Sequence, residues 1–313
     1  MTIKIGISSC LLGEKVRFDG GHKGSAFCMQ QLSEHVRYVP VCPEMAIGMP
    51  APRPAIRLQQ QHNNQIHLVQ SNDNSIDHTQ AMLAFCDTKL PALSALSGYI
   101  VCAKSPSCGM ERVRLFDATG QQLGKLAVGL YTRQLMQKYP WLPIEEDGRL
   151  FDHALKENFI CRVFSCYDYQ QTMQHGFSVG KLVAFHSRYK FLVMAHSPTA
   201  YRELGRLVAN AKFFAAEELQ QRYLLQLMQA LKNIATRKQH TNVLQHLQGF
   251  LKHGLAAEAK QELSDLIHRY RQGFVPLLAP LTLLQHHLKQ LPNAYVSNQR
   301  YFAPYPENLG LRA

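Results

Sequence analysis

The chain has 313 residues, enough for two domains, and a composition of 46% hydrophobic and 18% charged residues excludes an intrinsically disordered protein. The net charge of +12 is unevenly divided: residues 1–175 hold 17 Lys and Arg against 15 Asp and Glu, whereas residues 176–313 hold 17 against 7. This basic second half indicates a polyanionic partner, nucleic acid first, although a solvated basic surface with no partner has the same composition.

The N-terminus enters a strand pattern directly and shows no signal peptide, and no run of about 18 apolar residues is present. We therefore expect a cytoplasmic protein without a membrane span. None of the eight cysteines forms a CxxC pair, which disfavours a zinc ribbon. Free thiols or metal ligands are expected rather than disulfides.

The first half of the chain alternates strands, loops and helices. Strands are expected at Ile3–Ser8, Val36–Val41, Gly98–Ala103 and Val113–Phe116, with an exposed hairpin over 55–75 and an edge segment over 142–148. Helices are expected at Ala26–His35, Asp77–Lys89 and Gly129–Tyr139. The alternation predicts an α/β domain with a mainly parallel, Rossmann-like sheet, for which we take residues 1–160.

The second half has a helical pattern from Lys181 onward, so an all-α domain is expected over 181–313 after a linker over 161–180. Ser197 and Pro198 form a helix start, with Ser as N-cap and Pro in the first turn. The aromatic tail over 295–306 is expected to be irregular and to pack on its own domain; stacking on nucleic-acid bases is the alternative.

Three cysteines each follow an expected parallel strand: Cys10, Cys42 and Cys108. Ligands of open α/β sheets bind outside the carboxyl ends of the strands, where these thiols can converge. Three thiols without histidine suit iron–sulfur or zinc, and three protein ligands leave one position open for substrate. The alternative is three unrelated buried cysteines. The remaining thiols are expected in the hydrophobic core: Cys28, Cys86, Cys102, Cys161 and Cys166.

Polar residues near these cysteines are candidates for chemistry. Glu44, two residues after Cys42, is a candidate general base, and its alternative is an ordinary loop carboxylate. Ser105 and Ser107 flank Pro106 and are either hydrogen-bond donors to a substrate or turn residues. The residues expected to contact substrate are Arg17, Asp19, Gly21, His22, Lys23, Lys104 and Ser107, several of them in a Gly-rich segment that is otherwise a tight loop.

Four separated motifs closely resemble the TudS-type thiouracil desulfidases: Ser8–Gly13, Val16–Lys23, Val41–Glu44 and Lys104–Gly109. The resemblance covers about residues 3–160. Residues 185–305, including Phe-His-Ser-Arg-Tyr-Lys from Phe185, resemble the YbgA-type helical domain of unknown function. The two domains in this order resemble the RudS-type enzymes, which remove sulfur from 4-thiouridine in tRNA.

This resemblance implies a 4Fe–4S cluster held by Cys10, Cys42 and Cys108, whose fourth iron has no protein ligand and binds the thiocarbonyl sulfur of the substrate. Hydrolysis then replaces C=S by C=O without net redox change. By matching position, Glu44 activates the water, and Ser105 assists through a hydrogen bond to substrate or intermediate. Bound iron makes sulfur a better leaving group, so the implied chemistry is consistent.

The resemblance also implies a partner for the basic second half, namely tRNA. An enzyme that acts on a free thiouracil base would need no such basic domain, whereas one that acts on tRNA would. The residues expected to contact phosphates are Arg188, Lys190, Arg202, Arg206 and Lys212. Two alternatives stay open: a desulfidase of free thiouracil or thionucleosides, and a non-catalytic iron–sulfur or zinc RNA-binding regulator. The oligomeric state is left open.

Overall fold

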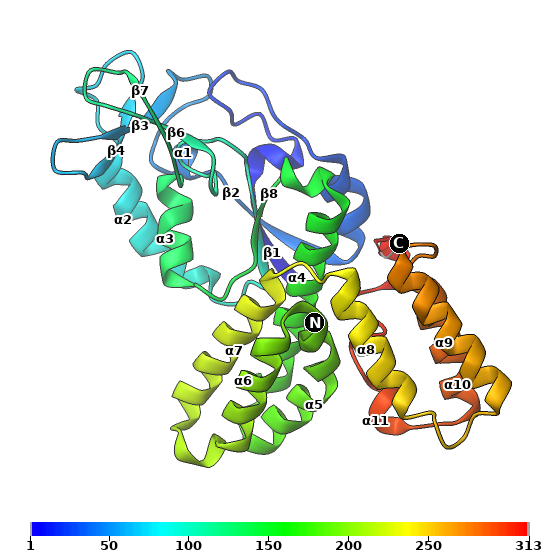
Figure 1. Cartoon of the computed structure of the whole chain (residues 1–313). Helices are drawn as coiled ribbons and strands as arrows, with labels where there is room; N and C mark the ends of the chain where they lie inside the picture. The colour runs from blue at the N-terminus through cyan, green and yellow to red at the C-terminus, as the bar shows by residue number, and fades with distance from the viewer. Residues whose placement is uncertain (1, 312–313) are drawn as a thin grey trace. The chain divides into compact units, whose positions relative to one another are not determined.

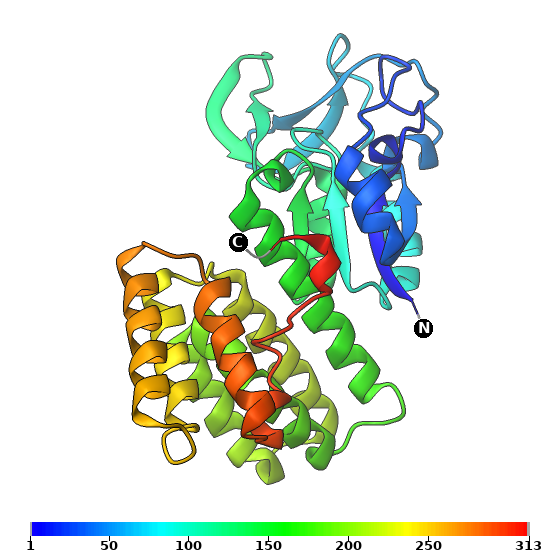
Figure 2. The ribbon, with the colours of Figure 1, turned by 90° about the vertical axis from the view of Figure 1, so that its right-hand side faces the viewer.

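The computed structural model describes residues 2–311 and consists of two compact units, which divide between Asp152 and His153 (Figures 1 and 2). Met1, in the predicted first domain, and Arg312 and Ala313, in the predicted second, lie outside the described residues. Each unit is described by itself.

A parallel four-stranded sheet forms the centre of the first unit, in the order β2-β1-β5-β8. Its strands are β1 Ile3–Ser8, β2 Val36–Val41, β5 Gly98–Val101 and β8 Ile144–Glu146. All of β5 is buried, and β1 is buried from Ile5 onward, as expected for parallel strands covered on both faces. The predicted α/β class with a mainly parallel sheet is confirmed.

A second sheet of mixed direction has the order β4-β3-β6-β7. Its strands are β3 Ile56–Gln60, β4 Ile66–Gln70, β6 Val113–Phe116 and β7 Gln122–Ala127. The expected hairpin is present as β3 and β4, but it is not isolated, because Leu58 of β3 pairs with Leu115 of β6 and both are buried. This second sheet was not expected, because the pairing joins strands nearly sixty residues apart, which no local pattern encodes.

Three α-helices belong to the first unit: α1 Pro43–Ala46, α2 Thr79–Lys89 and α3 Leu130–Lys138. The expected helix over 26–35 is instead a π-helical turn, Phe27–Gln31, followed by a 3-10 turn, Leu32–Glu34. Further 3-10 turns are Ser9–Leu12, Leu90–Leu93 and Arg149–Phe151.

The second unit is all helical, as predicted. Its helices are α4 His153–Met173, α5 Val179–His196, α6 Pro198–Ala209, α7 Ala216–Lys232, α8 Arg237–Gly249, α9 Ala257–Gln272, α10 Leu278–Gln290 and α11 Ala294–Ser297. Short 3-10 turns are Ala211–Phe213 and Glu307–Leu309. Ser197 caps α6 by accepting a hydrogen bond from the Ala200 amide at 3.1 Å, which confirms the expected helix start.

The predicted linker over 161–180 differs from the structure, because α4 continues to Met173. Apolar residues within it face the helical core; the Tyr169 ring, for example, stacks on Tyr223 at 5.7 Å and meets Phe185 edge-on at 5.2 Å. The chain leaves the helix only at the turn near Gly176, whose φ of 92° is in the left-handed region. The first predicted domain is correspondingly shorter, since residues from His153 onward belong to the helical unit.

The C-terminal tail packs across its own domain, as expected. Arg300 Nε donates to Asp168 Oδ2 of α4 at 2.9 Å, and the Tyr305 hydroxyl donates to Glu157 at 2.6 Å. Tyr301 is fully buried. Within residues 2–311, no helix has both the length and the apolar character needed to cross a membrane.

His186 makes the stability of the helical unit sensitive to acid. Burial, with a smaller effect of Lys190, lowers the pKa of this imidazole, which contacts the Tyr223 hydroxyl at 3.1 Å, to about 4. Between about pH 6.5 and pH 4 the unfolded chain binds a proton that the folded chain does not, so stability falls as the pH falls. His186→Gln should reduce this acid-dependent loss in the free energy of unfolding by up to about 3 kcal/mol. The measurement is urea unfolding at pH 7 and at pH 4.5.

The matched control is His175→Gln, at an exposed position between α4 and α5. This control should keep the wild-type pH dependence. An unchanged pH dependence in His186→Gln would contradict the assignment.

Candidate active site

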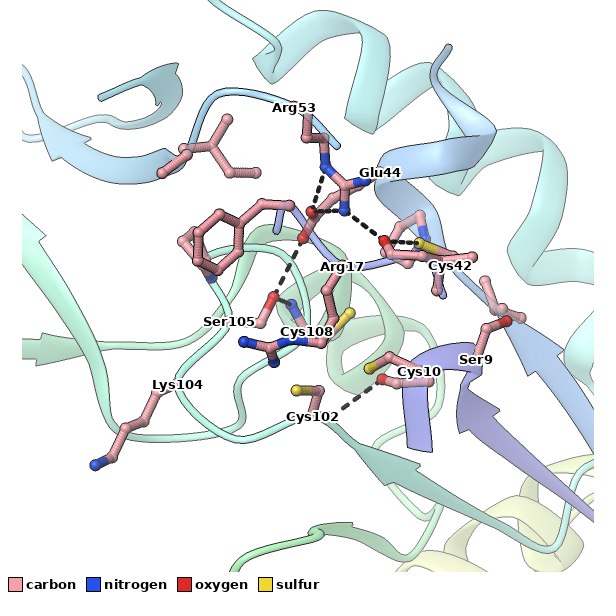
Figure 3. A pocket seen from close by; sticks show the side chains of 18 of the residues that line it. Ser9, Cys10, Arg17, Cys42, Glu44, Arg53, Cys102, Lys104, Ser105 and Cys108 are labelled. Carbon is pink, nitrogen blue, oxygen red and sulfur yellow. Dashed lines mark hydrogen bonds and ion pairs between the residues drawn. The ribbon is translucent and has the colours of Figure 1, made fainter. Parts of the chain in front are cut away.

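Four thiols line one cavity of about 260 Å³ in the first unit (Figure 3). Cys10 follows β1, Cys42 follows β2 and Cys102 follows β5, while Cys108 lies in the loop that continues from β5. Because the four strands are parallel, their carboxyl ends share one edge of the sheet. The structure thus brings the three predicted ligands Cys10, Cys42 and Cys108 together.

The cavity lies where the strand order reverses. The chain passes from β1 outward to β2 on one side, and β5 is added on the other side of β1. Such a switch point leaves a crevice beyond the carboxyl ends, which is the usual ligand site of open parallel sheets. The Ser8 hydroxyl accepts a hydrogen bond from the Cys102 amide at 3.1 Å, so the ends of β1 and β5 are tied together at this point.

Cys102 corrects the sequence-based interpretation, which placed it in the hydrophobic core. It is buried but lines the cavity together with Cys10. The signal was available, since Cys102 directly follows a buried strand in the same way as Cys10 and Cys42. The other four thiols predicted to be in the core are buried as expected: Cys28, Cys86, Cys161 and Cys166.

Burial and mutual contact govern the protonation of these thiols. Burial raises the pKa of Cys42 and of Cys108. The interaction between the Cys10 and Cys102 side chains raises the pKa of Cys10 and lowers that of Cys102. Metal binding at Cys10, Cys42 and Cys108 must displace protons, since thiolates are the ligands.

Backbone contacts hold the loop that carries Cys108. The Ser105 hydroxyl accepts hydrogen bonds from the amides of Ser107 at 3.3 Å and Cys108 at 3.1 Å. Thr132 of α3 donates its hydroxyl to the Cys108 carbonyl at 2.6 Å. The residue before α3 is Gly129, where a Cβ would lie 2.6 Å from the Ser107 carbonyl, so only glycine permits this close approach.

Glu44 and Ser105 meet at the wall of the cavity. Ser105 Oγ donates to Glu44 Oε1 at 3.3 Å, although the two residues come from different loops, after β2 and after β5. Arg53 binds the other carboxylate oxygen, Oε2, through Nε at 3.0 Å and also through Nη2. One oxygen of Glu44 is therefore fixed by the guanidinium and the other faces Ser105 (Figure 3).

Arg53 is the functional residue that the sequence analysis missed. As a whole residue, Arg53 is 8% exposed. Besides Glu44, it donates to the carbonyls of Pro50 at 3.0 Å and Val16 at 2.9 Å. An arginine inside a segment rich in Gly and Pro is a weak signal by itself. Its partner lies nine residues earlier and is recognisable only in the folded loop.

The predicted substrate contacts divide into two groups. Arg17 and Lys104 line the cavity, although the Lys104 side chain extends away from the thiols (Figure 3). The remaining residues are not among its lining: Asp19, Gly21, His22, Lys23 and Ser107.

Local structure accounts for the residues that do not line the cavity. Asp19 pairs with Arg17 at 3.4 Å and accepts from the Gly21 amide, whereas His22 accepts from the Gly24 amide. Lys23 Nζ lies 2.8 Å from Asp147, which also accepts from the Ala103 amide. Ser107 is fully buried, and its hydroxyl has no partner.

The cavity thiols suit a cluster better than a single metal ion. Within the described residues, no three His, Cys, Asp or Glu side chains are gathered closely enough to hold a single metal ion. A cluster makes a different demand, because each thiolate binds a different iron atom. Three thiols spaced around one cavity, with a fourth beside Cys10, are chemically suited to an iron–sulfur group.

The five predicted RNA contacts are placed differently in the helical unit. Arg188 lies 3.6 Å from Asp168 and over the Phe185 ring, and Lys190 lies over the rings of Phe191 and Tyr295. The other three are exposed: Arg202, Arg206 and Lys212.

Residues 5–147 match the family model of 2-thiouracil desulfurase, and residues 190–306 match that of DUF1722, a protein family of unknown function. The 4Fe-4S-dependent thiouracil desulfidase TudS is a structural relative with 27% identity and a TM-score of 0.40, over 51% of this chain and 100% of that one. Most of the first unit thus matches the 2-thiouracil desulfurase family model, and the helical unit matches a second family model.

That helical domain has a curated relative in the uncharacterized protein YbgA of Escherichia coli. The two are 35% identical over 157 residues, which are 50% of this chain and 93% of the relative. The chain belongs to the YbgA family.

Proposed function

We propose that the protein is an iron–sulfur-dependent desulfidase that hydrolyses the C=S group of 4-thiouridine in tRNA to C=O. One observation carries the chemistry: Cys10, Cys42 and Cys108 line the cavity in which Glu44 and Ser105 meet, in a domain that matches the 2-thiouracil desulfurase family. The reaction consumes one water and releases hydrogen sulfide, so it needs neither oxidant nor reductant.

The thiols of Cys10, Cys42 and Cys108 would hold a 4Fe–4S cluster. When bound, this group supplies an iron without a protein ligand, which accepts the thiocarbonyl sulfur and makes it a better leaving group. Four free cysteines line this pocket, and only three of them are assigned as cluster ligands. The fourth, Cys102, would lie beside Cys10 without binding the cluster.

Glu44 is the group placed to take a proton from water. Arg53 holds Oε2, which leaves Oε1 as the oxygen that faces the cavity next to Ser105. A water near Oε1 would lose its proton to the carboxylate as it attacks the base carbon. Ser105, already a donor to Oε1, would redirect its hydroxyl to the oxygen or nitrogen of the substrate.

The helical domain favours tRNA as the substrate. Residues 176–313 carry a net charge of +10, whereas residues 1–175 carry +2. Phosphate binding by such a surface supplies affinity that a free base cannot obtain. A thiolated base within tRNA must leave its stack to reach a buried cavity, as in other enzymes that act on bases. We expect this reaction in the cytoplasm, where thiols stay reduced.

A second candidate is a desulfidase of free thiouracil or thionucleosides. The name of the matched family favours it. A third possibility, of another class, is an iron–sulfur or zinc RNA-binding regulator without catalysis.

The full-length protein, purified and reconstituted without oxygen, should decide among these functions. We expect sulfide release and loss of the near-UV thiouridine absorbance with thiolated tRNA, at a higher kcat/KM than with free 4-thiouridine. Glu44→Gln should lower kcat by about 10²- to 10⁴-fold. Turnover of the free compounds alone would favour the second candidate, and RNA binding without sulfide release would overturn the enzymatic function.

The ligand assignment predicts the metal content of cysteine variants. Cys10→Ala, Cys42→Ala and Cys108→Ala should each lose the cluster or its activity, because a remaining pair of thiolates holds it poorly. Cys102→Ala and the buried control Cys86→Ala should keep it. Iron and acid-labile sulfide per chain are the measurement, and loss of both in Cys102→Ala would show that the ligand set is wrong.

Arg53 is expected to act by positioning Glu44. Arg53→Gln frees Oε2 and should lower kcat at least about tenfold, while KM and the iron content stay near wild type. Arg53→Lys should recover little, since an ammonium cannot reproduce the guanidinium fork. Arg57→Gln, which removes an Asn74 contact outside the cavity, is the control. Loss of iron in Arg53→Gln would instead indicate a purely structural role.

A further inference from the structure

The end of α9 presents an aromatic ring to solvent on a rigid support. The Gly273 amide donates to the Tyr270 carbonyl and the Phe274 amide to the Arg269 carbonyl, both at 3.0 Å, and Gly273 has a φ of 93°. This pair of bonds is the Schellman closure of a helix. It fixes the backbone of Phe274, so the ring is displayed from a defined position.

The Phe274 ring does not pack where such a ring usually packs. In this helix closure the residue at the Phe274 position commonly makes an apolar contact with the last turn of the helix. Here the facing residues are His268 and Arg269, both exposed, and Phe274 is 72% exposed. A large apolar ring therefore stays in water among cationic side chains.

Cationic side chains lie at the same two helix ends as Phe274. Arg237, the first residue of α8, donates Nη1 to the Tyr270 carbonyl at 2.9 Å and lies over the Tyr270 ring. The start of α8 and the end of α9 thus lie side by side (Figures 1 and 2). Lys238, Arg269 and Arg271 are exposed at the same helix ends.

Acidic residues are missing from this part of the sequence. Residues 219–257 contain five Lys or Arg and no Asp or Glu, and residues 266–306 contain four and again none. The nearest acid along α9, Asp265, accepts a hydrogen bond from Gln261. Phe213 is similarly exposed, at 71%, but Glu217 and Glu218 follow it in the first turn of α7. Charge therefore favours Phe274 as the site for a polyanion.

We propose that Phe274 stacks on an unpaired base of the RNA substrate while Arg237, Arg269 and Arg271 contact the neighbouring phosphates. This inference rests on the proposed function and adds a defined contact surface to it. Aromatic rings beside basic side chains are how proteins hold unpaired nucleotides without reading their sequence. A lipid surface fits less well, because membrane-bound helices offer a continuous apolar face and this site offers a single ring.

Binding of the full-length protein to thiolated tRNA and to a short single-stranded RNA tests the proposal. Phe274→Ala should raise the Kd for both by about 5- to 100-fold, the range for loss of one base–aromatic stack. Phe274→Tyr should bind like wild type. Phe151→Ala, which removes a ring that is 86% exposed, is the matched control and should also bind like wild type. Arg269→Gln with Arg271→Gln should reduce the salt dependence of log Kd by about one to two units of slope.

The outcomes separate this site from the function as a whole. Phe274→Ala should desulfurise free 4-thiouridine at the wild-type rate, which shows that it is folded and active. Wild-type affinity of Phe274→Ala for both RNAs would overturn the stacking site and leave the tRNA function standing. Failure of the wild-type protein to bind either RNA, or binding only to phosphatidylserine vesicles, would overturn both.

Discussion

The structure of the site depends on the shared edge of one parallel sheet. Four strands in the order β2-β1-β5-β8 end at this edge, and each delivers a polar residue there: Cys10, Cys42, Cys102 and Asp147. Strands β1 and β5 are mostly apolar, and polar groups collect where they stop. Convergence of thiols from distant parts of the chain follows from strand direction alone and needs no metal to assemble it.

The ion pair of Arg53 and Glu44 is costly to bury, and its main effect is to orient the Glu44 carboxylate. Both side chains are largely removed from water: that of Arg53 is 2% exposed and that of Glu44 is 13% exposed. The cost of burying two charges offsets most of their attraction. Additional hydrogen bonds from Arg53 to the carbonyls of Pro50 and Val16 compensate part of that cost. A carboxylate held this firmly keeps one oxygen aimed at the cavity, which suits a base that must accept a proton at a fixed position.

Local patterns predicted those parts of the site that local sequence determines. Cys10 and Cys42 directly follow strands of alternating or buried residues, so their convergence could be foreseen. The place of Arg53 in the site could not be foreseen, because it depends on the ion pair with Glu44. The two residues come together only when the Gly- and Pro-rich segment folds back. The second sheet was missed for a similar reason: Leu58 pairs with Leu115 across the chain. Cys102 was misassigned because the buried strand before it was given more weight than its terminal position.

The two units differ in the balance between their acidic and basic side chains. Some cations of the first unit pair with buried acids, as in Lys23 with Asp147 and Arg112 with Glu146. In the helical unit one acid, Asp168, serves both Arg188 and Arg300 and ties the tail to α4. The few acids there are too scarce to neutralise the remaining Lys and Arg. Self-repulsion among cations that no acid balances disfavours the folded state, so the excess of Lys and Arg in the helical unit costs stability unless a polyanion neutralises it.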